Sequence, residues 1–257
     1  MYSLTQDQID FFNKNGFLVV THEEHQLFDK EDIQRWTSEI EGWPRESNKW
    51  MPYDEINSKG ERQLMRVERF ADYHQDFNKF MRGESLLHVL SQLTGKINFK
   101  YPNGGGFGAH TDAPAYTHVG DITHLTVNAA IDNATPENGC LEVVKGSHKM
   151  DVEYDQKCIT PEWENSHQWT PVPLKVGDLI FFGSYLAHRS GANTTQTSRR
   201  ALYATYHSSK DDGDALRDKY YAHRYETFPP DHERVKGKDY SEGIAQYAFA
   251  APFSVAN

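Results

Sequence analysis

The sequence is poor in cysteine and has no long apolar run, and these absences exclude several classes of protein. Its two cysteines, Cys140 and Cys158, are too few for a disulfide scaffold or a thiolate metal cage, although one bridge between them stays open. No apolar run reaches the roughly 18 residues of a membrane-spanning helix, and the first residues lack a basic segment followed by an apolar stretch. We therefore expect a cytoplasmic protein with no membrane association.

Basic residues are outnumbered by acidic ones. Lys and Arg total 27 against 37 for Asp and Glu, which gives a formal net charge of −10. This charge would repel a phosphate backbone, so we do not expect a nucleic-acid partner. A small anionic substrate remains compatible, because a pocket can be locally basic in an acidic protein.

The chain divides into a helical first part, a β-rich middle and a further helical part. Helices are expected at about 5–15, from a cap at Asp29 to a stop at Pro44, and over a stretch that closes at Gly95, with a short strand FLVV after the first. The middle part, about 96–208, has apolar runs separated by turn residues, namely INFKY, LTVNAAI, CLEVV, DLIFFGSYLAH and ALYATYH. These runs predict a β barrel or sandwich. Residues 209–257 begin with a helical pattern that ends at paired prolines, and the length suits one domain over 1–257.

A candidate metal-binding motif lies at the start of the β-rich part. In Gly-Phe-Gly-Ala-His110-Thr-Asp112, the imidazole and the carboxylate stand two residues apart, so in an extended chain they share one face. Two histidines and one carboxylate on one side of an iron ion leave coordination sites open for a cosubstrate and O2. His188 is the best candidate for the second histidine, because an antiparallel strand could bring it beside His110.

An arginine, Arg199, follows His188 eleven residues later in the sequence. Arg199 would begin the next strand, and a guanidinium inside a barrel is costly to bury unless a carboxylate meets it. The far carboxylate of 2-oxoglutarate would supply a planar, bidentate partner.

These motifs together resemble those of the phytanoyl-CoA dioxygenase family. The matching segments are H110-T-D112-A-P-A, I131-D-N-A-T-P-E-N-G-C-L-E-V-V-K-G-S-H148 and H188-R-S-G-A-N-T-T-Q-T-S-R199. The resemblance implies a double-stranded β-helix core (jelly-roll, cupin-like) with N-terminal helices and a C-terminal helical extension. It also implies that His110, Asp112 and His188 bind Fe(II), that Arg199 anchors 2-oxoglutarate with Ser190, and that Asn128 lies near this cosubstrate. O2 would be the second cosubstrate, and succinate and CO2 the by-products.

Other residues have both a functional and a structural interpretation. Arg66, in the segment QLMRVERF, either forms an ordinary ion pair or points into the barrel mouth toward the cosubstrate or an anionic substrate group. Together with Lys100 it could receive a phosphonate or a carboxylate. Tyr101 and Tyr116 flank the metal motif and either line the substrate pocket or simply fill strand positions. Three further histidines, His118, His124 and His148, are expected outside the metal site, the last in a structural role.

The function expected from the resemblance is hydroxylation of an unactivated C–H bond in a small polar or zwitterionic metabolite. A 2-aminoethylphosphonate-like compound or a natural product would suit it. Two alternatives come from other classes of protein. One is a metal-dependent isomerase or hydrolase on the same barrel, which would not need Arg199. The other is a non-catalytic family member that supports a partner subunit.

Overall fold

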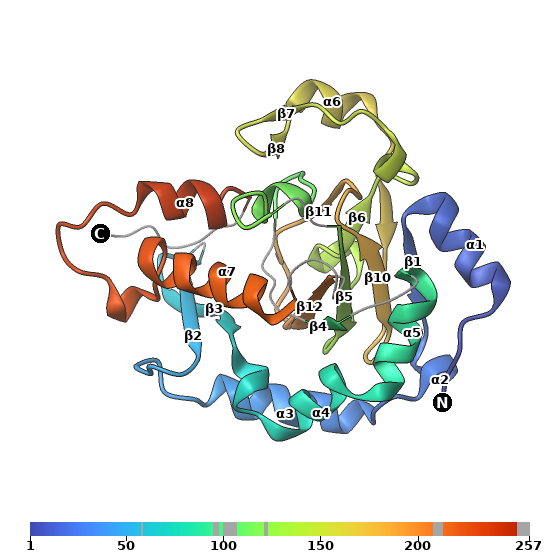
Figure 1. Cartoon of the computed structure of the whole chain (residues 1–257), viewed down its shortest axis with the longest axis horizontal. Coiled ribbons are helices and arrows are strands. Elements are labelled where there is room, and N and C mark those ends of the chain that lie inside the picture. Colours follow the sequence, from blue (N-terminus) through green and yellow to red (C-terminus); the bar gives the residue numbers. More distant parts are fainter. Residues whose placement is uncertain (58, 95–97, 100–106, 121–122, 208–212, 251–257) are drawn as a thin grey trace.

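Two antiparallel sheets form the centre of the computed structural model, which describes residues 1–57, 59–94, 98–99, 107–120, 123–207 and 213–250 (Figure 1). The larger sheet has the order β1 (Phe17–Val20), β10 (Leu179–Gly183), β5 (His124–Ala130), β12 (Ala201–His207) and β4 (Asn98–Phe99). The smaller sheet has the order β11 (His188–Ser190), β6 (Leu141–Val143) and β9 (Thr170–Val172). This arrangement agrees with a jelly-roll core, as the sequence predicts.

Two hairpins and the helices surround these sheets. The hairpins are β2 (Met51–Ile56) with β3 (Arg62–Glu68), and β7 (Tyr154–Asp155) with β8 (Cys158–Ile159). The α-helices are α1 (Gln6–Asn15), α2 (His22–His25), α3 (Lys30–Glu41), α4 (Gln75–Arg82), α5 (Glu84–Thr94), α6 (Pro161–Ser166), α7 (Gly213–Thr227) and α8 (Ser241–Tyr247). Short 3-10 turns lie at Phe70–Asp72, Ala113–Ala115, Pro136–Asn138, Ser147–Lys149 and Asp231–Glu233. Among the described residues, no helix is both long and apolar enough to span a bilayer.

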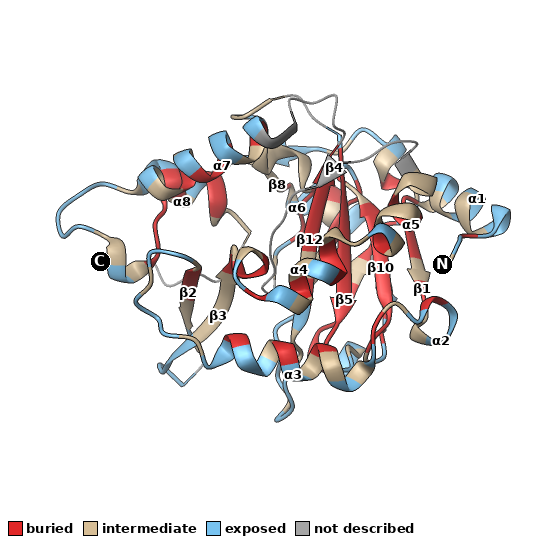
Figure 2. Cartoon of the chain, turned by 60° about the horizontal axis from the view of Figure 1, so that its bottom comes forward, coloured by how far each residue is buried: buried red, intermediate tan, exposed pale blue. Residues whose placement is uncertain are grey.

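Strand β5 is buried on both faces because each face packs against a different layer (Figure 2). Leu125, Val127 and Ala129 belong to the cluster formed with helices α3, α4 and α5. The alternate residues Thr126 and Asn128 face the opposite way, into the space between the two sheets. Full burial of each large apolar side chain contributes about 1.5–3 kcal/mol. The alternation therefore fixes which side chains of β5 can reach a site inside the barrel.

One predicted strand is wrong in its extent. The run DLIFFGSYLAH is not a single strand, because β10 ends at Gly183 in the larger sheet and β11 begins at His188 in the smaller one. The backbone N–H of Leu186 donates to the carbonyl of Gly183 at 3.0 Å and closes a turn between them. Because the run from Leu179 to His188 is mostly apolar and, apart from Gly183 and Tyr185, buried, hydrophobicity alone does not reveal the crossing.

Of the other predicted helices and strands, some are confirmed and some are incomplete. Helices α1, α3, α5 and α7 are confirmed, and α1 is capped by Thr5. The expectation of a helical first part is incomplete, because it misses the β2–β3 hairpin. Of the predicted strand INFKY, only Asn98–Phe99 lies within the described residues, where it forms β4.

His148 lies at the surface of the fold and packs on the end of α1. Its Nε2 atom is 3.3 Å from the carbonyl oxygen of Asn13, and its ring covers Gly16. Gly16 has φ +83° and lies so close to the ring that any Cβ there would collide with it. The structural role expected for His148 is consistent with these contacts.

We expect His148→Ala to lower the free energy of unfolding by about 0.5–1.5 kcal/mol, the usual net worth of one hydrogen bond. Urea unfolding followed by circular dichroism measures the loss. Iron(II) affinity of the folded variant should equal that of the wild type. Loss of iron binding in folded protein would show that the wrong histidines have been chosen for the metal.

Candidate metal centre and its cavity

His110 and His188 lie directly opposite each other on neighbouring extended segments. The backbone N–H of His110 donates to the carbonyl of His188 at 3.0 Å, and the N–H of His188 donates back at 2.9 Å. Residues that exchange both hydrogen bonds in an antiparallel pair point their side chains to the same face. The two rings therefore lie side by side, with centroids 4.2 Å apart.

Both rings are oriented by carbonyl groups of their own segments. The Nδ1 atom of His110 lies 2.7 Å from the carbonyl oxygen of Gly108, and that of His188 lies 2.9 Å from the carbonyl oxygen of Leu186. A carbonyl only accepts, so each Nδ1 carries a proton, and in the neutral form of such a ring the lone pair is on Nε2. Both Nε2 atoms face Asp112.

Asp112 completes the group through one carboxylate oxygen. Its Oδ1 atom is 3.7 Å from Nε2 of His110 and 3.6 Å from Nε2 of His188. Its Oδ2 atom accepts a hydrogen bond of 2.8 Å from the hydroxyl of Thr126, on β5. The carboxylate is thus held with one oxygen toward the imidazoles and the other tied to the sheet.

The three donor atoms of His110, Asp112 and His188, which together are called the metal group, fit a single metal ion. All three donor atoms lie within 4.8 Å of one another. An ion placed between two of them, with coordination bonds of roughly 2.0–2.2 Å to each, can bridge the distances measured from Asp112 to the two histidines. Burial and the adjacent His188 lower the pKa of His110 to about 3, so this ring is neutral and able to donate its lone pair. Burial would raise the pKa of Asp112, but His188 and His124 outweigh it and hold the pKa below the usual carboxyl range. Two neutral imidazoles and one carboxylate are the donor set that suits iron(II) with open positions.

Thr126 is a residue that the sequence did not single out, and its bond to Asp112 has a measurable consequence. We expect Thr126→Val, which keeps the shape of the side chain, to weaken iron(II) affinity by roughly 10–100-fold, the usual effect of losing an outer partner of a ligand. Anaerobic titration with iron(II) measures it. Thr126→Ser retains the hydroxyl and should stay near the wild type; equal losses in both variants would assign the effect to packing.

Two residues expected near the cosubstrate, Arg199 and Asn128, meet at Tyr203. Burial raises the pKa of Tyr203, and the charge of the Arg199 guanidinium and a hydrogen bond with the Asn128 side chain counteract this rise. Asn128 and Tyr203 are direct partners in the β5–β12 register. Tyr203 belongs to the wall of the cavity next to the metal group, whereas Arg199 and Asn128 are not among the described residues that line it. The buried Nε atom of Arg199 has no hydrogen-bond partner among the described residues, which leaves a donor for a carboxylate.

Ser190 lies in the same wall of the cavity as His188, two residues farther along β11. Its Oγ atom accepts a hydrogen bond of 2.9 Å from the backbone N–H of Phe107. The hydroxyl hydrogen is still available to donate to a bound molecule.

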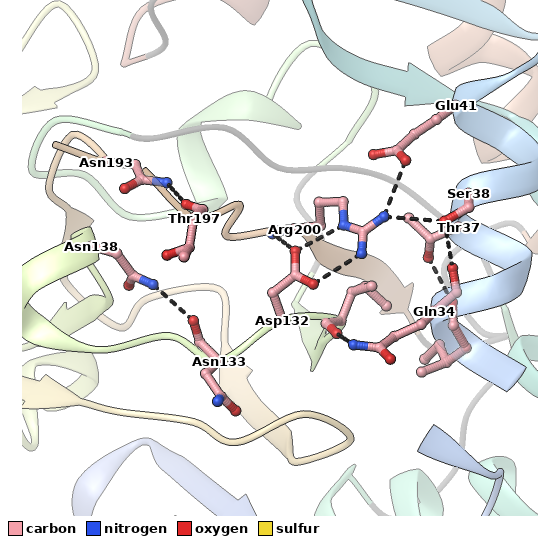
Figure 3. Close-up of polar contacts among 12 residues, drawn as sticks. Gln34, Thr37, Ser38, Glu41, Asp132, Asn133, Asn138, Asn193, Thr197 and Arg200 are labelled. Carbon is pink, nitrogen blue, oxygen red and sulfur yellow. Dashed lines mark hydrogen bonds and ion pairs between the residues drawn. The ribbon is translucent and has the colours of Figure 1, made fainter. Parts of the chain in front are cut away.

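Arg200 is not among the described residues that line the cavity, and both it and Arg199 precede β12 instead of beginning it, contrary to the expectation for Arg199. Arg200 forms a bidentate pair with Asp132, at 2.8 Å from Nε and 2.9 Å from a terminal nitrogen (Figure 3). A further ion pair of 3.1 Å reaches Glu41 on α3. Arg200 therefore links the end of the sheet to the outer helices.

Arg66 lines the cavity and forms part of a buried ion cluster. One of its terminal nitrogens lies 3.2 Å from Oε1 of Glu68, and one of Arg224 lies 2.5 Å from the same oxygen. The side chains of Glu68 and Arg224 are each 1% exposed, and all three residues line the cavity together with the metal group. The sequence analysis left two interpretations of Arg66 open and did not single out Glu68, although alternation along β3 puts both on one face. The sequence did not indicate that Arg224 belongs to the site, because nothing in the pattern of α7 distinguishes it from a surface arginine.

The aromatic and histidine candidates have mixed outcomes. Tyr116 is in the cavity wall, stacked on Tyr220 with centroids 5.4 Å apart. Lys100 and Tyr101 lie outside the described residues. His124 lies behind the metal group, with Nε2 3.9 Å from Oδ2 of Asp112, and His118 instead bonds to Tyr247 at 2.8 Å.

Comparisons with known proteins agree with this geometry. Residues 12–201 match the family model described as phytanoyl-CoA dioxygenase. The chain is 38% identical to a 2-aminoethylphosphonate dioxygenase from uncultured bacterium HF130_AEPn_1, over 98% of this chain and 99% of the relative. It is 36% identical to a methylphosphonate hydroxylase from Gimesia maris, over 88% of each.

Solved structures with a similar fold include EctD from S. alaskensis, crystallised with 2-oxoglutarate and 5-hydroxyectoine. The two chains superpose with a TM-score of 0.65 at 19% identity, over 81% of this chain and 77% of the other. This likeness concerns the fold. Taken with the family match over most of the sequence, it shows that the chain belongs to the phytanoyl-CoA dioxygenase family of iron(II)- and 2-oxoglutarate-dependent oxygenases and is a dioxygenase.

Proposed function

We propose that this dioxygenase hydroxylates a C–H bond of a small aminoalkylphosphonate. The observation that carries the proposal is the pair of buried guanidiniums that line the cavity beside the metal group. These guanidiniums, of Arg66 and Arg224, both contact one carboxylate oxygen of Glu68. A phosphonate offers anionic oxygens to such a pair. Two relatives at 36–38% identity are named for phosphonate substrates.

The residues of the metal group have defined roles in this proposal. His110, Asp112 and His188 hold iron(II), and Arg199, with Ser190 and Asn128, holds the far carboxylate of 2-oxoglutarate. With both bound, the chemistry available is oxidation of a substrate C–H bond to C–OH by O2, coupled to conversion of 2-oxoglutarate to succinate and CO2.

The protein contributes position and exclusion of water. Thr126 fixes the direction of the Asp112 carboxylate, and the backbone carbonyls of Gly108 and Leu186 fix the imidazoles. Aromatic side chains line the remaining cavity, namely Phe107, Tyr116, Phe182, Tyr203, Tyr220, Tyr247 and Phe249. A substrate held by the arginines would thus meet the metal in an enclosed space with few competing water molecules.

The proposal is tested by loading the protein with iron(II) and 2-oxoglutarate without oxygen, then admitting O2 with one compound of a panel. The panel contains 2-aminoethylphosphonate, ethylphosphonate, methylphosphonate, ectoine and phytanoyl-CoA. We expect succinate in equal amount to a hydroxylated phosphonate, identified by phosphorus NMR. Coupled succinate release with ectoine or phytanoyl-CoA and none with any phosphonate would overturn it.

A further inference from the structure

The buried carboxylate of Glu68 has one oxygen committed and one available. Arg66 and Arg224 both contact Oε1. Oε2 is buried and has no hydrogen-bond partner within the described part of the chain. A carboxylate present only to neutralise two arginines would be expected to use both oxygens, since an unsatisfied buried acceptor is costly.

The surroundings of Glu68 suit a cation. Glu68 lines the cavity with Tyr116, Tyr220 and Tyr247, and the first two are stacked. Aromatic faces attract ammonium groups, and an ammonium has three N–H donors for a buried carboxylate. A ligand without an N–H or O–H donor at this position would leave this oxygen unsatisfied.

We infer that Glu68 is a specificity-determining residue, which binds the amino group of the substrate while Arg66 and Arg224 bind its anionic group. This inference rests on the proposed function and deepens it. The two carbons between nitrogen and phosphorus in an aminoethylphosphonate match a site in which opposite charges are adjacent. The chain would then favour aminoalkylphosphonates over alkylphosphonates of the same length.

Because Arg224 is part of the site, the site also requires the C-terminal part of the chain. Arg224 comes from α7, while Glu68 comes from β3, so the adjacent sites for the amino group and for the anionic group both exist only when these two elements are docked (Figure 1). Tyr53 of β2 and Tyr247 of α8 cover the Arg224 guanidinium at 4.9 and 4.5 Å from their ring centroids. The recognition of both charged groups of the substrate is therefore assembled outside the two central sheets.

The experiment compares 2-aminoethylphosphonate with ethylphosphonate in the wild type and in Glu68→Gln. We expect Glu68→Gln to raise KM for 2-aminoethylphosphonate on the order of 30-fold or more, as for loss of a buried charge pair. KM for ethylphosphonate should change by less than about threefold, because it lacks the group that Glu68 binds. Asp132→Asn makes the same change in an arginine-paired carboxylate outside the cavity, and both KM values should stay as in the wild type.

The outcomes separate the two levels of the proposal. A wild type that releases no succinate with any phosphonate overturns the proposed function and this inference with it. A wild type that oxidises ethylphosphonate as efficiently as 2-aminoethylphosphonate overturns this inference alone. So does Glu68→Gln raising both KM values equally, which would mean that Glu68 only positions the arginines. If Glu68→Gln fails to fold, Glu68→Asp serves instead, and an unchanged ratio of kcat/KM for the two compounds would overturn the inference.

Discussion

Asp112→Ala should abolish iron(II) binding and turnover in a protein that still folds. Two neutral imidazoles remain, and without the carboxylate they bind ferrous iron poorly. The loss should exceed the roughly 10–100-fold that removal of an outer partner causes. Iron(II) retained after anaerobic equilibrium dialysis, together with succinate release, measures it.

Asp32→Ala is the matched control for this substitution. Asp32 is a carboxylate in an exposed ion pair with Arg35 on α3, far along the chain from the metal group. Its removal should change neither iron binding nor activity. Thermal unfolding of both variants shows whether Asp112→Ala remains folded, and full activity in that variant would contradict the ligand assignment.

Arg199→Ala should raise the concentration of 2-oxoglutarate needed for half-maximal activity by a factor of about 30 to several thousand. Breaking a charge-assisted arginine–carboxylate contact in a desolvated site costs roughly 2–5 kcal/mol, and about 1.4 kcal/mol corresponds to a factor of ten. Iron(II) affinity measured without 2-oxoglutarate should stay nearly unchanged. The measurement is the 2-oxoglutarate dependence of succinate release at saturating iron.

Arg200→Ala is the internal control, because the bidentate contact of Arg200 goes to Asp132 and neither is among the described residues that line the cavity. This variant should lose stability through Asp132 and Glu41, with little change in the requirement for 2-oxoglutarate. If Arg200 is the sensitive position, the cosubstrate lies on the other face of β12. If neither substitution matters, the isomerase or hydrolase alternative gains support.

The metal group was predictable from the sequence because its geometry is local. His110 and Asp112 are two residues apart, and alternation in an extended segment determines where they point. The pairing of His188 with His110 required a tertiary assumption, an antiparallel partner, which the backbone confirms. The β-rich centre and four of the eight α-helices in the described part of the chain followed from turn residues and apolar periodicity.

The substrate end of the cavity was not predictable in the same way. Glu68 and Arg224 are 156 residues apart, and neither the β3 pattern nor the α7 pattern reveals that they meet. The crossing between β10 and β11 was hidden for a related reason: an apolar run that stays buried does not show which sheet it joins. Non-local docking of elements, rather than local propensity, determines both features.

The carbonyls that hold the two imidazoles have an energetic consequence for metal binding. Each histidine is fixed by the carbonyl two residues before it, at Gly108 and Leu186, so both rings are oriented by the fold itself. Immobilising a free side chain at a binding site costs about 0.5–1.5 kcal/mol of entropy. Here the entropy of the two rings is lost during folding and not on metal binding. The preorganised rings therefore make the free energy of metal binding more favourable.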